Sequence, residues 1–155
     1  MEILLRNAQR KYKVSSPQLK KKTKTVLEQL GCHDSELSIL LVSDEKIRQL
    51  NHQYRNLDVA TDVLSFPQNE EGAGEFDSHL LGDVVISVET AHRQAGEHQL
   101  ILEEELVLLL IHGILHLLGY DHERSPREER VMKQKTRELF ALVFPGRKPS
   151  SDCGY

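Results

Sequence analysis

The sequence lacks the features that mark secreted, disulfide-stabilised and membrane-spanning proteins. Its 155 residues include only two cysteines, Cys32 and Cys153, which lie far apart and in no metal-binding spacing. A disulfide framework is therefore not expected, whereas a reducing compartment is. The basic beginning of the sequence has no apolar run of signal-peptide length, and the longest apolar stretch, residues 106–118, is too short and too interrupted to span a bilayer. We expect a cytoplasmic protein that does not enter a membrane.

The composition is typical of one globular domain with a buried core. Hydrophobic residues make up 39% of the chain and charged residues 28%, a balance that favours a folded rather than a disordered protein. A chain of this length buries a core without disulfides or structural metals. No linker, repeat or low-complexity block divides the sequence. We predict a single domain over residues 1–144 and a disordered tail over residues 145–155.

Charge is distributed unevenly along the chain. The net charge is −4, yet residues 1–30 carry eight Lys and Arg against two Glu. A local basic patch attracts nucleic acid even on an anionic protein, although a run of lysines is also compatible with a merely solvated helix face. We expect the predicted helix in this region to present the following side chains outward and to contribute to binding of nucleic acid: Lys20, Lys21, Lys22 and Lys24.

Apolar periodicity and chain-breaking residues predict a mixture of strands and helices. The pattern favours strands at residues 2–7, 36–42, 61–66 and 81–88, and helices at residues 17–30, from residue 44 onward, after residue 88, and at residues 103–118 and 127–143. A polar loop is predicted between residues 68 and 79. Since the two element types do not alternate strictly, we predict an α+β fold: a small mixed sheet of about four strands packed against several helices, with a central buried apolar helix.

The central helix carries two histidines at metal-binding spacing. His112 and His116 are four residues apart and therefore lie one turn from each other on the same helix face. Gly119 stands where this helix should end, and glycine readily adopts the left-handed conformation that reverses the chain. That reversal can return His122 to the other two. Three neutral imidazoles would then hold one zinc ion and leave a fourth position open, as in catalytic sites.

The histidine pattern has two alternative interpretations, an ordinary packed core histidine and a metalloprotease, and the sequence counts against both. Isolated histidines on apolar helices are usually packed core residues, but burying two imidazoles among leucines is unfavourable without partners, and a metal supplies them. The spacing also resembles the metzincin pattern H-E-x-x-H-x-x-G-x-x-H, except that Gly113 replaces the general-base glutamate. Because a peptidase would lack its main proton acceptor, the sequence favours a different hydrolysis.

Three ordered blocks of sequence resemble one known family. Residues 112–122 read HGILHLLGYDH, residues 50–55 and 61–67 read LNHQYR and TDVLSFP, and residues 81–87 read LGDVVIS. These blocks resemble the signatures of the YbeY family of bacterial metallo-endoribonucleases, and the resemblance covers roughly residues 2–143.

The resemblance implies both an activity and further site residues. It implies a zinc-dependent, single-strand-specific endoribonuclease that acts in rRNA maturation at the small-subunit 3′ end and in ribosome quality control. Its partners would be single-stranded RNA, rRNA and the ribosome. Arg55 stands at the family's arginine position, which implies a role in catalysis or RNA binding; on its own, this residue would be read as a surface ion pair. An arginine can hold a phosphate bidentately and stays charged.

Several assignments stay open at this level. Asp121 could orient a ligand histidine, and Asp62 and Asp83 are expected to fix turns or backbone, although either could serve the site. Structural roles are expected for Ser65 and Ser87. Surface or structural roles are expected for the other histidines: His33, His52, His79, His92 and His98. Nickel, copper or iron would also suit three imidazoles. Competing functions are another zinc hydrolase, such as a peptidase, and a non-catalytic ribosome assembly factor. The general base, the attacking nucleophile and the oligomeric state are not specified.

Overall fold

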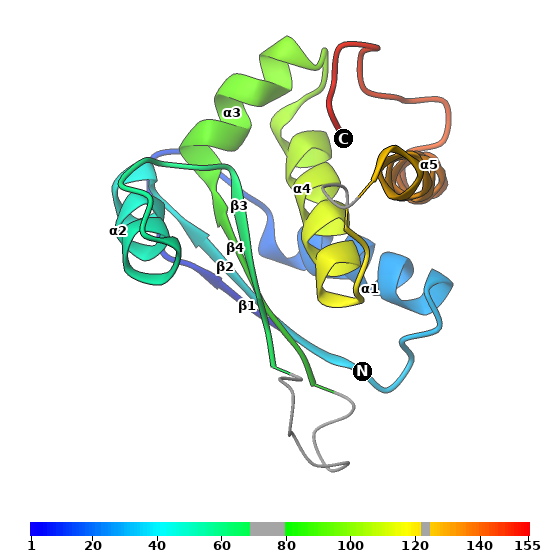
Figure 1. Ribbon diagram of the computed structural model, residues 1–155, viewed down its shortest axis with the longest axis horizontal. Helices are drawn as coiled ribbons and strands as arrows, with labels where there is room; N and C mark the ends of the chain where they lie inside the picture. Colours follow the sequence, from blue (N-terminus) through cyan, green and yellow to red (C-terminus); the bar gives the residue numbers. More distant parts are fainter. Residues whose placement is uncertain (69–79, 122–124) are drawn as a thin grey trace.

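The computed structural model describes residues 1–68, 80–121 and 125–155. Within these ranges the chain forms strands and helices that follow each other along the sequence without strict alternation (Figure 1). In chain order, the elements are β1 (Glu2–Asn7), α1 (Ser16–Gln29), β2 (Glu36–Val42), α2 (Asp44–Arg55), β3 (Val63–Pro67), β4 (Leu80–Ser87), α3 (Val88–Glu97), α4 (Leu102–Leu117) and α5 (Pro126–Val143).

The strands form one mixed sheet in the order β1-β2-β4-β3. β1, β2 and β4 are parallel to each other, and β3 runs antiparallel to β4 at the edge of the sheet. Parallel neighbours require crossover connections, and α1 supplies the one between β1 and β2. The antiparallel pairing places Ser65 of β3 opposite Val84 of β4. This edge of the sheet therefore faces α4 with side chains from both strands.

Helices cover both faces of the sheet (Figure 1). Alternate residues of β2, namely Leu37, Ile39 and Leu41, enter the main core together with residues of α1, α4 and α5. The opposite face carries a smaller cluster in which Ile47 of α2 packs with residues of β2, β3 and β4. Because successive strand side chains point to opposite faces, a single strand can contribute to both cores.

α4 is the central helix of the fold. All of its residues from Glu104 to Leu115 are buried, as expected for a helix that is apolar on every side. It packs against α1, α3, α5, β3 and β4. Glutamates in its first turn interact favourably with the positive end of the helix dipole. Among the described residues, no helix combines the length and the apolar character that a membrane crossing requires.

The predicted α+β fold is confirmed, with differences at the ends of elements. β3 begins at Val63 rather than at residue 61 and includes Pro67, and the helix that begins at residue 44 ends at Arg55. The predicted polar loop lies almost entirely outside the described residues. Residues 145–155, for which the sequence predicted disorder, have hydrogen bonds to α3, α4 and α5. Sequence patterns do not reveal these anchors, because their partners lie far away along the chain.

Candidate metal centre

The two helical histidines of the predicted site face one another on α4. The Nε2 atom of His112 lies 3.1 Å from the Nε2 atom of His116, and the two rings are almost perpendicular, at 78°. His112 is 8% exposed, while His116, one turn later, is partly exposed. The spacing in the sequence thus brings two ring nitrogens to one point at the edge of the buried part of α4.

This arrangement fits the first two ligands of a metal ion. Zn–N bonds of 2.0–2.1 Å at a tetrahedral angle place two ligand nitrogens about 3.3 Å apart, close to the 3.1 Å between the two Nε2 atoms. The described residues contain no cluster of three or more potential metal ligands. The third predicted ligand, His122, lies outside the described residues, so the complete ligand set stays a prediction.

The end of α4 adopts the reversal that the sequence predicted at Gly119. Gly119 has φ +96°, its N–H donates to the carbonyl of His116, and the N–H of Tyr120 donates to the carbonyl of Leu115. These two bonds define a Schellman motif, which satisfies the last carbonyls of a helix while the chain turns away. The motif brings Tyr120 and Asp121 to the wall of the pocket that contains His112 and His116.

Gly113 allows α4 to approach the sheet closely. A Cβ atom at this position would lie 2.8 Å from Cγ1 of Val84, so that something would have to shift, and 3.1 Å from Oγ of Ser65, which is a tight contact. The hydroxyl of Ser65 also donates to the carbonyl of Gly113 at 3.1 Å. Position 113 thus faces β3 and β4, where a glutamate side chain would have to displace Val84 or Ser65. The glycine that separates this sequence from the protease pattern has a packing role.

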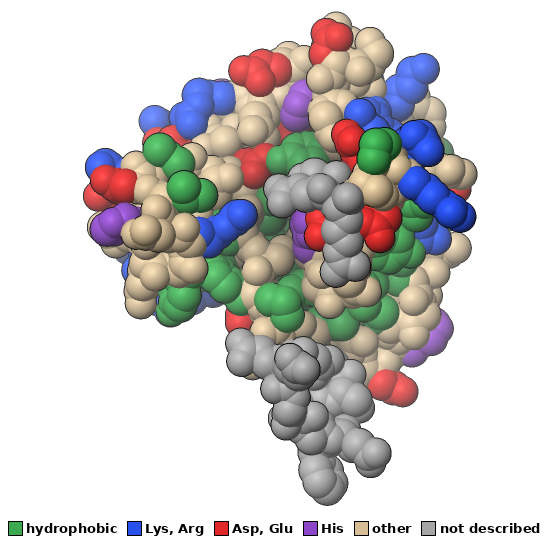
Figure 2. Space-filling model, viewed as in Figure 1, with side chains coloured by type: hydrophobic (Ala, Val, Ile, Leu, Met, Phe, Trp, Pro, Cys, Tyr) green, Lys and Arg blue, Asp and Glu red, His purple; other side chains and the backbone are tan. Residues whose placement is uncertain are grey.

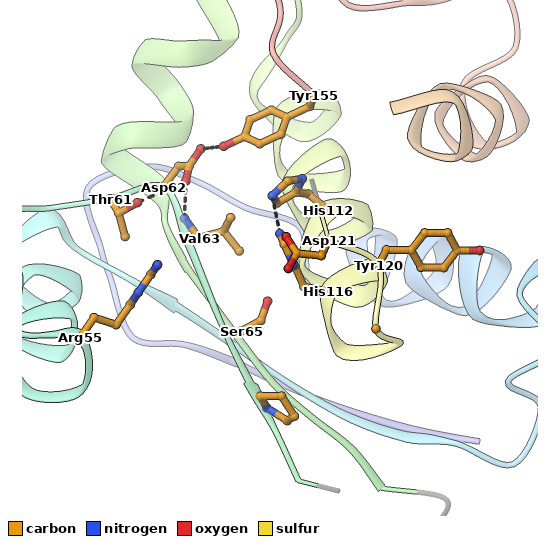
Figure 3. Close-up of a pocket in the computed structure, with 12 residues that line it drawn as sticks. Arg55, Thr61, Asp62, Val63, Ser65, His112, His116, Tyr120, Asp121 and Tyr155 are labelled. Atoms are coloured by element: carbon orange, nitrogen blue, oxygen red, sulfur yellow. Dashed lines mark hydrogen bonds between the residues drawn. The ribbon is translucent and has the colours of Figure 1, made fainter. Parts of the chain in front are cut away.

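The histidines line a pocket of about 510 Å³ between α4, β3, the end of α2 and the last residue of the chain (Figure 3). Its lining is mainly polar. The residues that form it are Arg55, Thr61, Asp62, Val63, Ser65, Pro67, His112, His116, Gly119, Tyr120, Asp121 and Tyr155. A pocket with a few convergent polar groups is the usual place for a ligand or substrate.

Arg55 enters this pocket from the side opposite the histidines (Figure 3). α2 ends directly after it, where Asn56 adopts the left-handed conformation with φ 58° and caps the helix. This C-cap directs the chain toward β3 and leaves the Arg55 side chain exposed. The structure thus brings Arg55 together with His112 and His116, although residues 55 and 112 are far apart in the sequence.

Asp62 and Tyr155 form a hydrogen bond in the upper part of the same pocket (Figure 3). The phenol of Tyr155 donates to Oδ2 of Asp62, while Oδ1 accepts from the Val63 N–H at 2.7 Å and from the Thr61 hydroxyl at 3.4 Å. Burial raises the pKa of Tyr155 far above its ordinary value, and the adjacent Asp62 carboxylate raises it further. The phenol therefore stays protonated and acts as a donor.

The structure separates the remaining predicted residues into those at the pocket and those elsewhere. Ser65 and Asp121 line it. Asp83 instead lies on another surface, where it accepts from Gln68 at 3.1 Å. Ser87 caps α3 through the Thr90 N–H and also donates to Asp44. The remaining described histidines do not line the pocket: His33, His52, His92 and His98. His79 lies outside the described residues.

Sequence reasoning assigned no role to Tyr155 or Tyr120, and it left Asp62 undecided. Tyr155 belongs to a segment with no periodic pattern, so nothing in the sequence indicated that its side chain reaches the histidines. Asp62 follows Thr61 in a block that resembles a family signature, and this resemblance was the only feature of the sequence that pointed to Asp62 as a site residue.

Basic side chains also gather over α5. The face shown in Figure 2 carries Lys and Arg side chains over this helix, which the sequence did not single out.

Comparison with known proteins identifies the family. The family model for endoribonuclease YbeY matches residues 4–143. An endoribonuclease YbeY of Geobacter metallireducens is 42% identical over 144 residues, covering 92% of this chain and 96% of the relative. The Aquifex aeolicus protein of the same name is 47% identical over 135 residues, covering 87% of this chain and 85% of its own.

A solved structure shows the same fold. The solution structure of a protein from Thermotoga maritima matches with a TM-score of 0.63 and 29% identity, and the match covers 94% of this chain and 99% of that one. The residues that the family model matches include every residue that lines the pocket except Tyr155. The chain therefore belongs to the endoribonuclease YbeY family.

Proposed function

We propose that this protein is a metal-dependent endoribonuclease whose reaction takes place in the pocket between His112, His116 and Arg55. Membership of the family makes it an enzyme, a hydrolytic nuclease that processes rRNA. We further propose that it prefers single-stranded RNA, acts at the 3′ end of the small-subunit rRNA and in ribosome quality control, and works in the cytoplasm with the ribosome as partner. The observation that carries the assignment to this pocket is the pair of Nε2 atoms 3.1 Å apart.

The metal would be held by His112, His116 and His122. We propose zinc, because neutral imidazoles suit it and three protein ligands leave one position open. The family supports a divalent metal in general, and nickel would suit the same ligands. When bound, a divalent ion supplies a Lewis acid for a phosphoryl oxygen and lowers the pKa of water.

Arg55 gives the pocket a group that can bind a phosphate. The Arg55 guanidinium points into the pocket opposite the two histidines (Figure 3). It can bind a phosphodiester in a planar, bidentate fashion and share the negative charge that develops on the phosphoryl oxygens. The Asp62 carboxylate accepts hydrogen bonds from Tyr155, Val63 and Thr61, which hold it in place at the pocket wall.

A peptidase is the first competing function. In the metzincin pattern the general-base carboxylate directly follows the first histidine, and here position 113 faces Val84 and Ser65, which a side chain would have to displace. The packing at Gly113 thus counts against this alternative more directly than the sequence pattern does. A non-catalytic ribosome assembly factor is the second competing function, and a pocket that combines the histidine pair with Arg55 gives it no particular support.

A combined metal and RNA assay tests the proposal. Purified protein is analysed for metal content and incubated with single-stranded RNA, duplex RNA and casein, before and after metal removal. We expect cleavage of single-stranded RNA only, and its loss with the metal. A 5′-phosphate on the product would indicate attack by water, and a 2′,3′-cyclic phosphate attack by the 2′-hydroxyl. Casein cleavage, or RNA cleavage that is unaffected by complete metal removal, would contradict the proposal.

A further inference from the structure

The segment that follows α5 returns across the molecule to the candidate site. Residues 145–155 lie beyond residues 4–143, which the family model matches. Arg147 anchors the beginning of the segment: its Nε donates to Oε2 of Glu104 at 2.8 Å, and its Nη2 donates to Oε1 at 3.0 Å. The Glu104 side chain at the start of α4 is 5% exposed, so this bidentate ion pair is partly shielded from solvent. The segment is thereby attached to the helix that carries the histidines.

Further contacts fix the path of the segment toward the pocket. The Ser150 N–H donates to the carbonyl of His98 at 2.9 Å. Arg137 of α5 donates to the carbonyls of Pro149 and Cys153 at 3.3 and 3.2 Å. The side chain of Cys153 is 1% exposed and belongs to the main core. These contacts involve the C-cap of α3, α4 and α5, so the segment is held at several points before it reaches the pocket.

Tyr155 makes two contacts in the pocket. Its ring stands against the His112 imidazole, with centroids 4.4 Å apart and planes at 63°. Its phenol donates to Asp62, which lies on the chain between Arg55 and β3. Both neighbours belong to the site, one as a predicted metal ligand and the other as the carboxylate in the same pocket as the Arg55 guanidinium (Figure 3).

We propose that residues 145–155 complete the active site and that Tyr155 is a positioning residue, which orients the His112 imidazole with its ring and the Asp62 carboxylate with its phenol. The inference rests on the proposed function, since it takes His112 as a metal ligand. The ring restricts the His112 imidazole to the orientation in which its Nε2 faces His116. The phenol keeps the Asp62 carboxylate from turning toward Arg55, where it would neutralise the charge that an RNA phosphate requires.

Two substitutions separate the two contacts. Tyr155→Phe keeps the ring against His112 and removes the donor to Asp62, whereas Tyr155→Ala removes both. Removing the partner of a metal ligand typically costs about 10- to 100-fold in metal affinity or activity. We expect Tyr155→Ala to weaken zinc binding by about this factor, and Tyr155→Phe to bind zinc as the parent does but to cleave RNA with a lower kcat. Asp152→Asn, an exposed position on the same segment, is the matched control.

The measurements are zinc affinity by competition with a chromophoric chelator, kcat and KM on single-stranded RNA, and the melting temperature of metal-free protein. A double-mutant cycle of Tyr155→Phe with Asp62→Asn should give a non-additive effect on kcat, because the phenol acts through the carboxylate. If residues 145–155 only stabilised the fold, the Tyr155 substitutions would change the melting temperature of metal-free protein. They would leave the zinc affinity and the coupling between Tyr155 and Asp62 unaffected.

The proposal and the function it rests on fail in different ways. If His112→Ala binds zinc as tightly as the parent, the proposed metal site is wrong. If His112→Ala loses zinc but Tyr155→Ala keeps both affinity and kcat, the site stands and the positioning role of Tyr155 is wrong. Faster cleavage by Tyr155→Ala would also overturn it, because the segment would then cover the site rather than complete it. If Tyr155→Ala does not fold, Tyr155→Phe and the double-mutant cycle decide.

Discussion

His112 and His116 lie one turn apart on α4, with their Nε2 atoms 3.1 Å from each other at the wall of a polar pocket. His112 belongs to the buried part of α4, and the Schellman motif at Gly119 ends the helix shortly after His116. The helix itself supplies two convergent ring nitrogens, and the proposed third ligand, His122, follows Gly119 by three residues in the sequence.

The first prediction concerns the ligands. We expect the parent to contain about one divalent ion per chain and His116→Ala to lose it, because three imidazoles are the proposed ligand set. Elemental analysis of both proteins measures this, and His52→Ala, a histidine away from the pocket, is the control. Near-stoichiometric metal in His116→Ala would show that the site lies elsewhere.

The second prediction concerns Gly113. Alanine in a helix normally stabilises a protein relative to glycine, by roughly 0.5–1 kcal/mol. We expect this gain at Gly96 of α3, where an added Cβ meets nothing within 4 Å, and a loss at Gly113, where it meets Val84 at 2.8 Å. Crowding of this kind typically costs about 1–3 kcal/mol. Chemical denaturation of the two Gly→Ala variants measures the difference, and equal effects would contradict the packing role.

Gly113→Glu extends this test to activity. The variant restores the protease-like sequence pattern, but its side chain would have to displace Val84 or Ser65 rather than enter the pocket. We therefore expect a destabilised protein without peptidase activity. Casein hydrolysis by this variant, in the presence of metal, would reverse the argument from position 113.

The third prediction concerns Arg55. Removing a preorganised donor to developing charge commonly costs about 10²–10³ in rate, and we expect this loss for Arg55→Ala. Arg55→Lys should also be impaired, because lysine keeps the charge but lacks the planar donor pair. Arg48→Ala is the matched control: it lies on the same helix, but its guanidinium is paired with Asp58 at 2.8 Å. Full cleavage by Arg55→Ala protein with parental metal content would remove Arg55 from the active site.

The fourth prediction concerns the basic residues of α1, whose four lysines are not equivalent. Lys22 forms an ion pair with Glu103 at 2.9 Å and lies over the Phe144 ring, so it connects α1 to α4 and to the residue after α5. Lys20, Lys21 and Lys24 are exposed. We expect their joint replacement by glutamine to weaken RNA binding and to flatten its salt dependence, because phosphate contacts by lysine release counterions. Lys22→Gln should mainly lower the melting temperature.

Replacement of the α5 residues Arg127 and Arg130, which are also exposed, provides the comparison. RNA affinities measured over a range of salt concentrations will show which face attracts the nucleic acid. An unchanged affinity and salt slope after the triple replacement on α1 would mean that this face is only solvated.

The fifth prediction concerns the anchor of residues 145–155. The hydrogen bond from Arg147 lowers the pKa of Glu104 below its ordinary value of 4.5. A carboxyl whose pKa is lower in the folded state stabilises the fold above its unfolded pKa, and this contribution disappears as the pH falls through the folded value. We expect Arg147→Gln to lower the free energy of unfolding at neutral pH and to differ little from the parent well below pH 4.5. A difference that is independent of pH would contradict this pairing.

Local sequence determined the elements of this fold and the first half of its site. β1 and β2 have the predicted bounds, and the i, i+4 spacing of His112 and His116 decided that the two imidazoles share a helix face. Gly119 ends α4 with a positive φ, as glycine at this position predicted. Such features depend on residues that are near each other along the chain, so the sequence alone is sufficient to predict them.

The tertiary structure decided what surrounds the histidines. Gly113 is required by contact with β3 and β4, and Asp62 enters the pocket because β3 pairs antiparallel to β4 beside α4. Tyr155 reaches His112 only because Arg147 and Cys153 fix the path of the chain after α5. The physical reason is the same in each case. These contacts join residues that are distant in sequence, and their partners become defined only when the helices have packed on the sheet.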